Sequence, residues 1–179
     1  HAVQQALEYL DDSALAIILY GDVPLIKLAT LIKLIEPVDS NSMAVLSCEV
    51  DDPTGFGRIV RNEAGSIISI VEDADASEAQ KSITEINTGI MAIPVAKLHD
   101  WLPRIKADNS QGEFYLTDII ALALADGCKV FSYSCKNQVE AKGVNNRLQL
   151  AQLERHYQQE QAQALLLSGV TLADPARID

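Results

Sequence analysis

Short apolar runs alternate with polar segments along the chain, and the spacing within each run predicts a type of secondary structure. Apolar residues at helical spacing predict a helix over residues 1–10. Residues 14–19 form an apolar run bounded by turn residues, which is typical of a buried parallel strand. The same criteria predict a helix over residues 27–36 and a strand over residues 43–50.

The middle of the chain resembles a hairpin that is followed by a loop and a further strand. Two extended pieces, around Ile59 and over residues 67–71, are separated by a short polar stretch that ends in Gly65. Residues 73–81 have few groups to bury and are predicted as a surface loop. Residues 86–93 are an apolar strand that Asn and Gly interrupt.

The last part of the chain continues the alternation of helices and strands. Helices are expected over residues 95–105 and 116–125, a strand over residues 129–134, and a long helix over residues 146–167. Strands that alternate with helices predict an α/β fold with an open, mostly parallel, Rossmann-like sheet. The hairpin predicts an antiparallel insertion, and the last helix a long C-terminal arm.

Composition narrows the classes of function. With 179 residues and 48% hydrophobic residues, the chain can bury a sizeable core, and no stretch is apolar enough to predict a membrane span. The net charge of −11 disfavours gripping nucleic acid or anionic lipid, although backbone amides and a metal can still bind phosphate locally. The three scattered cysteines, Cys48, Cys128 and Cys135, predict reduced thiols in a cytoplasmic protein.

Asp22 is the first candidate site residue, because it follows an apolar run directly. The crevice at the carboxyl ends of strands is where α/β proteins bind ligands, and a carboxylate there can anchor Mg²⁺ shared with phosphate oxygens. Gly21 holds no side chain between a ligand and the backbone, and Pro24 stops the strand. The alternative is that Asp22 caps the helix that starts near Lys27.

The interruptions of the later strands are the next candidates. Asn87 and Gly89 are poorly suited to an apolar strand, so they predict either a ligand contact, with the Asn87 amide on a sugar, or a bulge. Glu72 ends a strand and can accept hydrogen bonds from hydroxyl groups, or be a solvated acid. Gly57, in a pair of glycines around Phe56, can approach a ligand or belong to an ordinary turn.

Two further candidates adjoin predicted helices. Thr117 either caps the helix that follows it or reaches the crevice with its hydroxyl group. Asn146 is well placed as the N-cap of the long helix, which leaves Asn145 free to face the site.

Six blocks of sequence, taken together, resemble those of bacterial N-acetylglucosamine-1-phosphate uridyltransferases. They occur in the order known for that family, and Asp174-Pro175-Ala176-Arg177 resembles the entry to the second domain of these bifunctional enzymes. The blocks are Tyr20-Gly21-Asp22-Val23-Pro24-Leu25, Asp52-Pro53-Thr54-Gly55-Phe56-Gly57-Arg58-Ile59, Ile70-Val71-Glu72, Glu85-Ile86-Asn87-Thr88-Gly89, Gln111-Gly112-Glu113-Phe114-Tyr115-Leu116-Thr117-Asp118 and Gly143-Val144-Asn145-Asn146-Arg147.

The resemblance implies a fold of the nucleotide-diphospho-sugar transferase type and a cytoplasmic enzyme that supplies cell-wall and lipopolysaccharide precursors. Uridylyl transfer from UTP to N-acetylglucosamine 1-phosphate would give UDP-N-acetylglucosamine and pyrophosphate, and the complete family protein is a homotrimer. By position, the resemblance implies Mg²⁺ ligands at Asp22 and Asn145, nucleotide-sugar contacts at Tyr20 and Gly21, and contacts around the sugar at Gly57, Glu72, Asn87 and Thr117.

The family's first βα unit, with its glycine-rich loop, arginine and lysine, has no counterpart in these residues. The chain is therefore expected to be an internal part of such an enzyme, inactive alone and with its catalytic residues unassigned. Residues 1–145 would be the later part of the nucleotidyltransferase domain, residues 146–168 a helical linker arm, and residues 169–179 the start of a left-handed β-helix acetyltransferase domain. The alternatives are a related nucleotidyltransferase for another sugar and a catalytically silent module.

Overall fold

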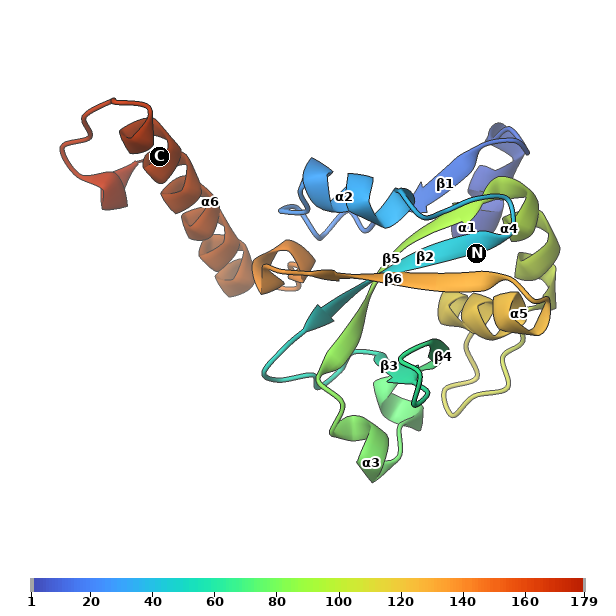
Figure 1. The fold of residues 1–179 in the computed structure, drawn as a ribbon. Helices are drawn as coiled ribbons and strands as arrows, with labels where there is room; N and C mark the ends of the chain where they lie inside the picture. The colour runs from blue at the N-terminus through green and yellow to red at the C-terminus, as the bar shows by residue number, and fades with distance from the viewer. Residues whose placement is uncertain (1, 179) are drawn as a thin grey trace.

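The fold is a mixed sheet with helices on both faces and a long helix that projects from one end (Figure 1). The computed structural model describes residues 2–178. His1, where the first predicted helix begins, and Asp179, where the last predicted segment ends, lie outside the described residues. Within the described part of the chain, no helix has the length and apolar character that crossing a membrane requires.

Within residues 2–178, six strands form the sheet, in the order β4-β3-β5-β2-β6, and β1 pairs with β5 beside this path. Their bounds are Leu15–Ile18 for β1, Ser42–Glu49 for β2, Arg58–Arg61 for β3, Ile67–Val71 for β4, Glu85–Pro94 for β5 and Lys129–Cys135 for β6. The α/β class and the antiparallel hairpin, which is β3 with β4, are confirmed. The prediction of a mostly parallel sheet is wrong, because among the described strands only β2 and β6 pair in parallel.

The first strand differs from the prediction in the same way. β1 is antiparallel to β5, and its side chains alternate between exposed and partly buried. Leu15 and Ile17 are 37% and 39% exposed, so one face of β1 is open rather than buried. A short apolar run has the same composition in an edge strand as in a central one, so the run could not show which partner it would find.

Strand direction explains how the site residues come together. Because β1 and β2 are both antiparallel to β5, and β6 is parallel to β2, the three strands β1, β2 and β6 run the same way. The segments that follow β1 and β6 therefore leave the sheet at the same end, where these strands have their carboxyl ends. Since β5 runs in the opposite direction, its first residues, which include Asn87, lie at that same end of the sheet.

The core lies on both faces of β2, whose side chains alternate between two apolar clusters. Met43 and Val45 belong to the cluster that α4 (Val95–Trp101) and α5 (Ile119–Ala125) cover. Ala44 and Leu46 belong to the opposite cluster, which α2 (Leu28–Ile35) covers with Leu34. The helices therefore pack against the two faces of the sheet, and loops occupy the end of the sheet described above.

The first predicted helix has shorter bounds than expected, and one predicted loop contains a short helix. The first predicted helix is α1 (Ala2–Ala6) continued by a 3₁₀ turn, Leu7–Tyr9. The segment predicted as a loop over residues 73–81 instead holds a 3₁₀ turn, Asp73–Asp75, and the short helix α3 (Glu78–Lys81). Ser77 and Gln80 form a capping box at the start of α3, and this local pairing stabilises a helix that has no apolar face. Further 3₁₀ turns are Leu102–Arg104, Leu116–Asp118, Gln138–Ala141 and Pro175–Arg177.

The last helix, α6 (Arg147–Leu167), projects away from the sheet (Figure 1). Its N-cap is Asn146, as predicted, whose side chain accepts a hydrogen bond from the Gln149 backbone N–H. The ammonium group of Lys27, just before α2, lies 2.9 Å from a carboxylate oxygen of Glu160 on α6. This contact joins the second half of α6 to the segment before α2.

Candidate functional site

Asp22 and Asn145 lie on two loops that a backbone hydrogen bond joins. A turn closes from the Val23 N–H to the Tyr20 carbonyl oxygen at 3.2 Å, and it presents Asp22 beyond the end of β1. The Val144 N–H donates to the Asp22 carbonyl oxygen at 2.9 Å, which places the residues before α6 against this turn. The helix α2 has Lys27 as its N-cap position and no side-chain cap, so the alternative of Asp22 as its cap is wrong.

Asn145 is oriented by the first turn of α6. Its backbone N–H donates to the Gln149 side chain at 2.7 Å, while Asn146 accepts from the Gln149 N–H at 3.0 Å. Within residues 2–178, neither the Asp22 carboxylate nor the Asn145 side-chain amide has a hydrogen-bond partner. Both side chains are therefore available to a ligand.

Gly57, Glu72, Asn87 and Thr117 form a second group, in which every member contacts another. The Thr117 hydroxyl donates to a Glu72 carboxylate oxygen at 2.7 Å, and the Asn87 N–H donates to the Gly57 carbonyl oxygen at 2.7 Å. A Cβ atom at Gly57 would lie 3.1 Å from the other Glu72 oxygen. Since Thr117 bonds Glu72, and α5 has no side-chain cap, the capping alternative for Thr117 is wrong.

A buried arginine holds in place the chain segments that carry two members of this second group. Arg58, on β3, is 2% exposed and donates to the Phe56 carbonyl oxygen and to Asp73, the latter at 2.8 Å. These two partners adjoin Gly57 and Glu72 in the chain. A buried guanidinium with one carboxylate partner has a rigid geometry, so it holds both neighbours in place. The sequence marked Arg58 only as part of a block, because nothing local shows that an arginine will be buried.

Tyr20 precedes Asp22 by two residues, and its ring lies against Gly89, two residues after Asn87. Burial, together with the carboxylates of Glu72 and Asp22, raises the pKa of the Tyr20 hydroxyl above its usual value. The two carboxylates come one from each group, so the phenol lies within the electrostatic reach of both. Gly21, in contrast, is exposed, and a Cβ atom there would meet no atom within 4 Å.

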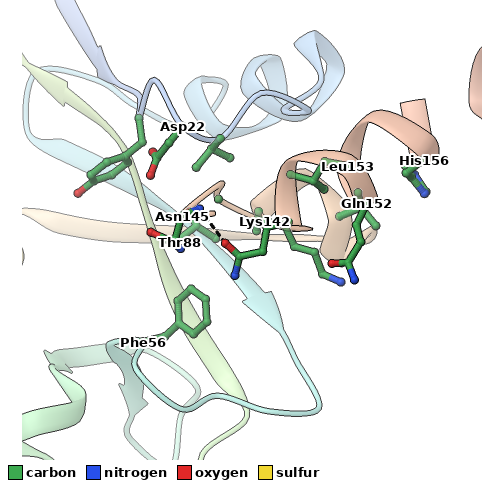
Figure 2. Close-up of a pocket in the computed structure, with 14 residues that line it drawn as sticks. Asp22, Phe56, Thr88, Lys142, Asn145, Gln152, Leu153 and His156 are labelled. Carbon is green, nitrogen blue, oxygen red and sulfur yellow. Dashed lines mark hydrogen bonds between the residues drawn. The ribbon is translucent and has the colours of Figure 1, made fainter. Parts of the chain in front are cut away.

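A cavity of about 520 Å³ opens beside Asp22 and Asn145. Figure 2 shows Asp22 and Phe56 on opposite sides of this opening, with Thr88 and Asn145 between them. The other wall comes from Lys142 and from one face of α6. That face comprises Gln149, Gln152, Leu153 and His156.

The sequence did not identify this second wall. Gln149, Leu153 and His156 recur at the spacing of one helix face, which is a signal, but no pattern in the helix indicates what the face will meet. Gly57, Glu72, Asn87 and Thr117 are not among the residues that line the cavity. The structure therefore places the predicted residues in two adjoining groups rather than in one pocket.

The donor set fits Mg²⁺ with few protein ligands. Within residues 2–178, no group of three or more His, Cys, Asp or Glu side chains is placed to hold a metal. Asp22 and Asn145 supply two oxygen donors, and Mg²⁺ is commonly held by one or two side chains together with phosphate oxygens and water. An ion here would depend on its ligand for most of its coordination.

Comparisons with known proteins relate the chain to one group of bacterial proteins. All 179 residues align with the bifunctional protein GlmU of Cellvibrio japonicus at 54% identity, of Acinetobacter baumannii strain AYE at 52%, and of Dechloromonas aromatica at 54%. The chain spans 39 to 40% of the length of these relatives. No family model matches the chain.

A solved structure supports the fold. A protein of Bacillus anthracis, provisionally assigned as a glucose-1-phosphate thymidylyltransferase and crystallised with a sucrose, superposes with a TM-score of 0.58. The likeness covers 98% of this chain and 63% of that one at 17% sequence identity, so it shows the fold alone. The closer evidence is the sequence: over its whole length, this chain is similar to part of the bifunctional protein GlmU of several bacteria.

Proposed function

We propose that the chain is the later part of a uridyltransferase domain that forms UDP-N-acetylglucosamine and pyrophosphate from UTP and N-acetylglucosamine 1-phosphate. The observation that carries the proposal is that two adjoining groups of residues lie at one end of the sheet. The first group is Asp22 with Asn145, and the second contains Glu72, Asn87 and Thr117. Identity of 52 to 54% to three GlmU proteins supports the same activity.

Each group has a distinct task in the proposed reaction. Asp22 and Asn145 would hold Mg²⁺, which neutralises charge on the phosphate groups during transfer. Glu72, Asn87 and Thr117 offer acceptors and donors to the hydroxyl and acetamido groups of the sugar. Tyr20 would contact the nucleotide sugar. Catalysis of this kind depends on position, which the backbone contacts described above supply.

The organisation of the longer protein is also a proposal. Residues 1–145 would belong to the nucleotidyltransferase domain, residues 146–168 would form a linker arm, and residues 169–179 would lead into an acetyltransferase domain. The helix α6 and its similarity to GlmU support the arm. A homotrimer in the cytoplasm, supplying cell-envelope precursors, follows from the same resemblance, and the buried free thiols of Cys48, Cys128 and Cys135 suit a reducing compartment.

A titration tests the assignment of the sugar. The ¹⁵N-labelled chain is titrated with UDP-N-acetylglucosamine, UDP-glucose and dTDP-glucose, each with and without Mg²⁺. We expect amide shifts around Asn87, Tyr20 and Asn145, strongest for UDP-N-acetylglucosamine and dependent on Mg²⁺. Equal responses to the three sugar nucleotides would contradict the proposed substrate, and shifts elsewhere would contradict the proposed site.

A further inference from the structure

Gly89 and Tyr20 face each other across a gap in the sheet. β1 pairs antiparallel with β5 up to Ile18 opposite Met91, and continuing this register by two residues places Tyr20 opposite Gly89. On the same edge of β5, β3 reaches only as far as Ile86. Among the described strands, neither β1 nor β3 pairs with β5 at Gly89 on this edge, and the Tyr20 ring lies against the glycine.

The ring lies directly on the glycine. A Cβ atom at Gly89 would be 2.4 Å from Cε2 and 2.8 Å from Cζ of Tyr20, closer than any side chain can approach. Gly89 also has a φ of +80°, a conformation that residues with a side chain rarely adopt. An aromatic side chain over a strand glycine replaces the cross-strand packing that the glycine cannot make.

A bulge in β5 creates this conformation. Between the pairings of Asn87 and Met91, β5 contains three residues where β2 contains only Leu46. The Thr88 hydroxyl donates to the Leu46 carbonyl oxygen at 2.8 Å, and the Gly89 N–H donates to the Asn87 side-chain oxygen at 3.0 Å. Asn87, a proposed sugar contact, thus has its carbonyl oxygen engaged in the bulge, which leaves its amide NH₂ for a ligand.

We propose that Gly89 is a positioning residue of the site: on the Asn87–Gly89 bulge, its lack of a side chain seats the Tyr20 ring at the boundary between the two groups of site residues. The turn from Tyr20 to Val23 contains Asp22, so the position of the Tyr20 ring also affects the position of the Asp22 carboxylate. The role in ligand binding rests on the proposed function, whereas the seat itself does not.

The chain offers a matched control. Gly65, in the hairpin turn, has a φ of +81°, but a Cβ atom there would meet nothing within 4 Å. Gly65→Ala therefore introduces the same backbone strain without displacing an aromatic ring. Comparing Gly89→Ala with Gly65→Ala separates the loss of the seat from the cost of a positive φ.

Two spectroscopic readouts test the seat without a ligand. In the unsubstituted chain, we expect the Gly89 Hα resonances to be shifted upfield by the Tyr20 ring, and this shift to vanish in Tyr20→Leu. In Gly89→Ala, displacement of the ring should weaken or remove the NOE cross-peaks between the Tyr20 ring protons and the backbone protons of residue 89 that the unsubstituted chain is expected to show. An unshifted Gly89 Hα, or NOE cross-peaks between the Tyr20 ring and residue 89 that Gly89→Ala leaves unchanged, would overturn the seat.

Ligand affinity tests the consequence. We expect Gly89→Ala to weaken UDP-N-acetylglucosamine binding about tenfold or more, as small displacements in a site do, and Gly65→Ala to leave it unchanged. In a Tyr20→Ala background, Gly89→Ala should cause no further loss of ligand affinity. If Gly89→Ala alone unfolds the protein, adding Tyr20→Ala should restore folding, because the ring that the new side chain meets is then absent. An additive loss in that background would show that Gly89 acts independently of Tyr20. These affinities are measured with the chain in place of the matching segment of the Cellvibrio japonicus protein. If that protein, without further substitution, does not bind this ligand, the proposed function fails, and the claim that Gly89 positions a ligand contact fails with it.

Discussion

The two groups of the site are built in opposite ways. Hydrogen bonds join Thr117 to Glu72 and Asn87 to Gly57. Gly57, Glu72 and Asn87 lie on or directly beside strands, and Thr117 lies on a 3₁₀ turn. Asp22 and Asn145 lie on loops, and within residues 2–178 their side-chain oxygens bond to no other residue. The contacts of the first group are thus made within the protein, whereas the second group has side-chain oxygens left for a ligand. This difference is what the proposed function requires, with a rigid sugar on one side and a metal ion with flexible phosphates on the other.

Removing the Asp22 carboxylate should have the largest effect. When this chain replaces the matching segment of the Cellvibrio japonicus protein, we expect Asp22→Ala to reduce uridylyl transfer by on the order of 100-fold or more, because the metal loses a ligand. Stability should change little, because Asp22 is exposed. Pyrophosphate release and thermal unfolding are the measurements, with Glu63→Ala in the exposed hairpin turn as control. Near-normal turnover would remove Asp22 from the mechanism.

A substitution next to the group that contains Glu72 should instead change the free energy of unfolding. Asp73→Asn takes away the charged partner of the buried Arg58 guanidinium, and we expect the free energy of unfolding to fall by about 2 kcal/mol. Asp75→Asn, in the same 3₁₀ turn, is the control because its carboxylate accepts from the Ser110 backbone N–H rather than from Arg58. Urea denaturation measures both. Equal effects of the two substitutions would show that Arg58 does not depend on its ion pair.

The sugar contacts should separate the two substrates. In the same chimeric protein, Asn87→Ala and Glu72→Ala should each weaken N-acetylglucosamine 1-phosphate by about 1 kcal/mol, the usual value of a lost hydrogen bond, and UTP by less. Thr117→Val, which removes the hydroxyl that orients Glu72, should act in the same direction. Steady-state KM values for each substrate measure this. A comparable rise of KM for UTP would contradict the assignment to the sugar side.

The smallest effect is expected far from both groups. Arg104 and Trp101 donate hydrogen bonds to Asp126 and lower its pKa from 3.8 to about 2. Because the folded pKa lies below the unfolded one, the contribution to stability is present above pH 4 and is lost as the pH falls toward 2. Asp126→Asn should flatten this part of the curve of unfolding free energy against pH. An unchanged curve would contradict it, and ligand binding near neutral pH should be unaffected.

Most elements and most candidate residues could be predicted from local pattern. The apolar runs identified all six strands, and turn residues located the hairpin. Asp22 and Asn145 were found because polar residues directly follow apolar runs or precede a capped helix. The role of Gly89 was not found. A glycine in a strand indicates a close approach, but the sequence does not tell whether a ligand or, as here, the Tyr20 ring makes it.

The sequence by itself determined the order of strands and helices, the candidate site residues, and the similarity to GlmU. Only the tertiary structure decided that β1 is an antiparallel edge strand, that β5 runs against its neighbours, and that a face of α6 lines the cavity. The reason is physical. Periodicity along a segment reports which of its faces is buried, whereas strand pairing and site assembly depend on contacts between segments far apart in the chain.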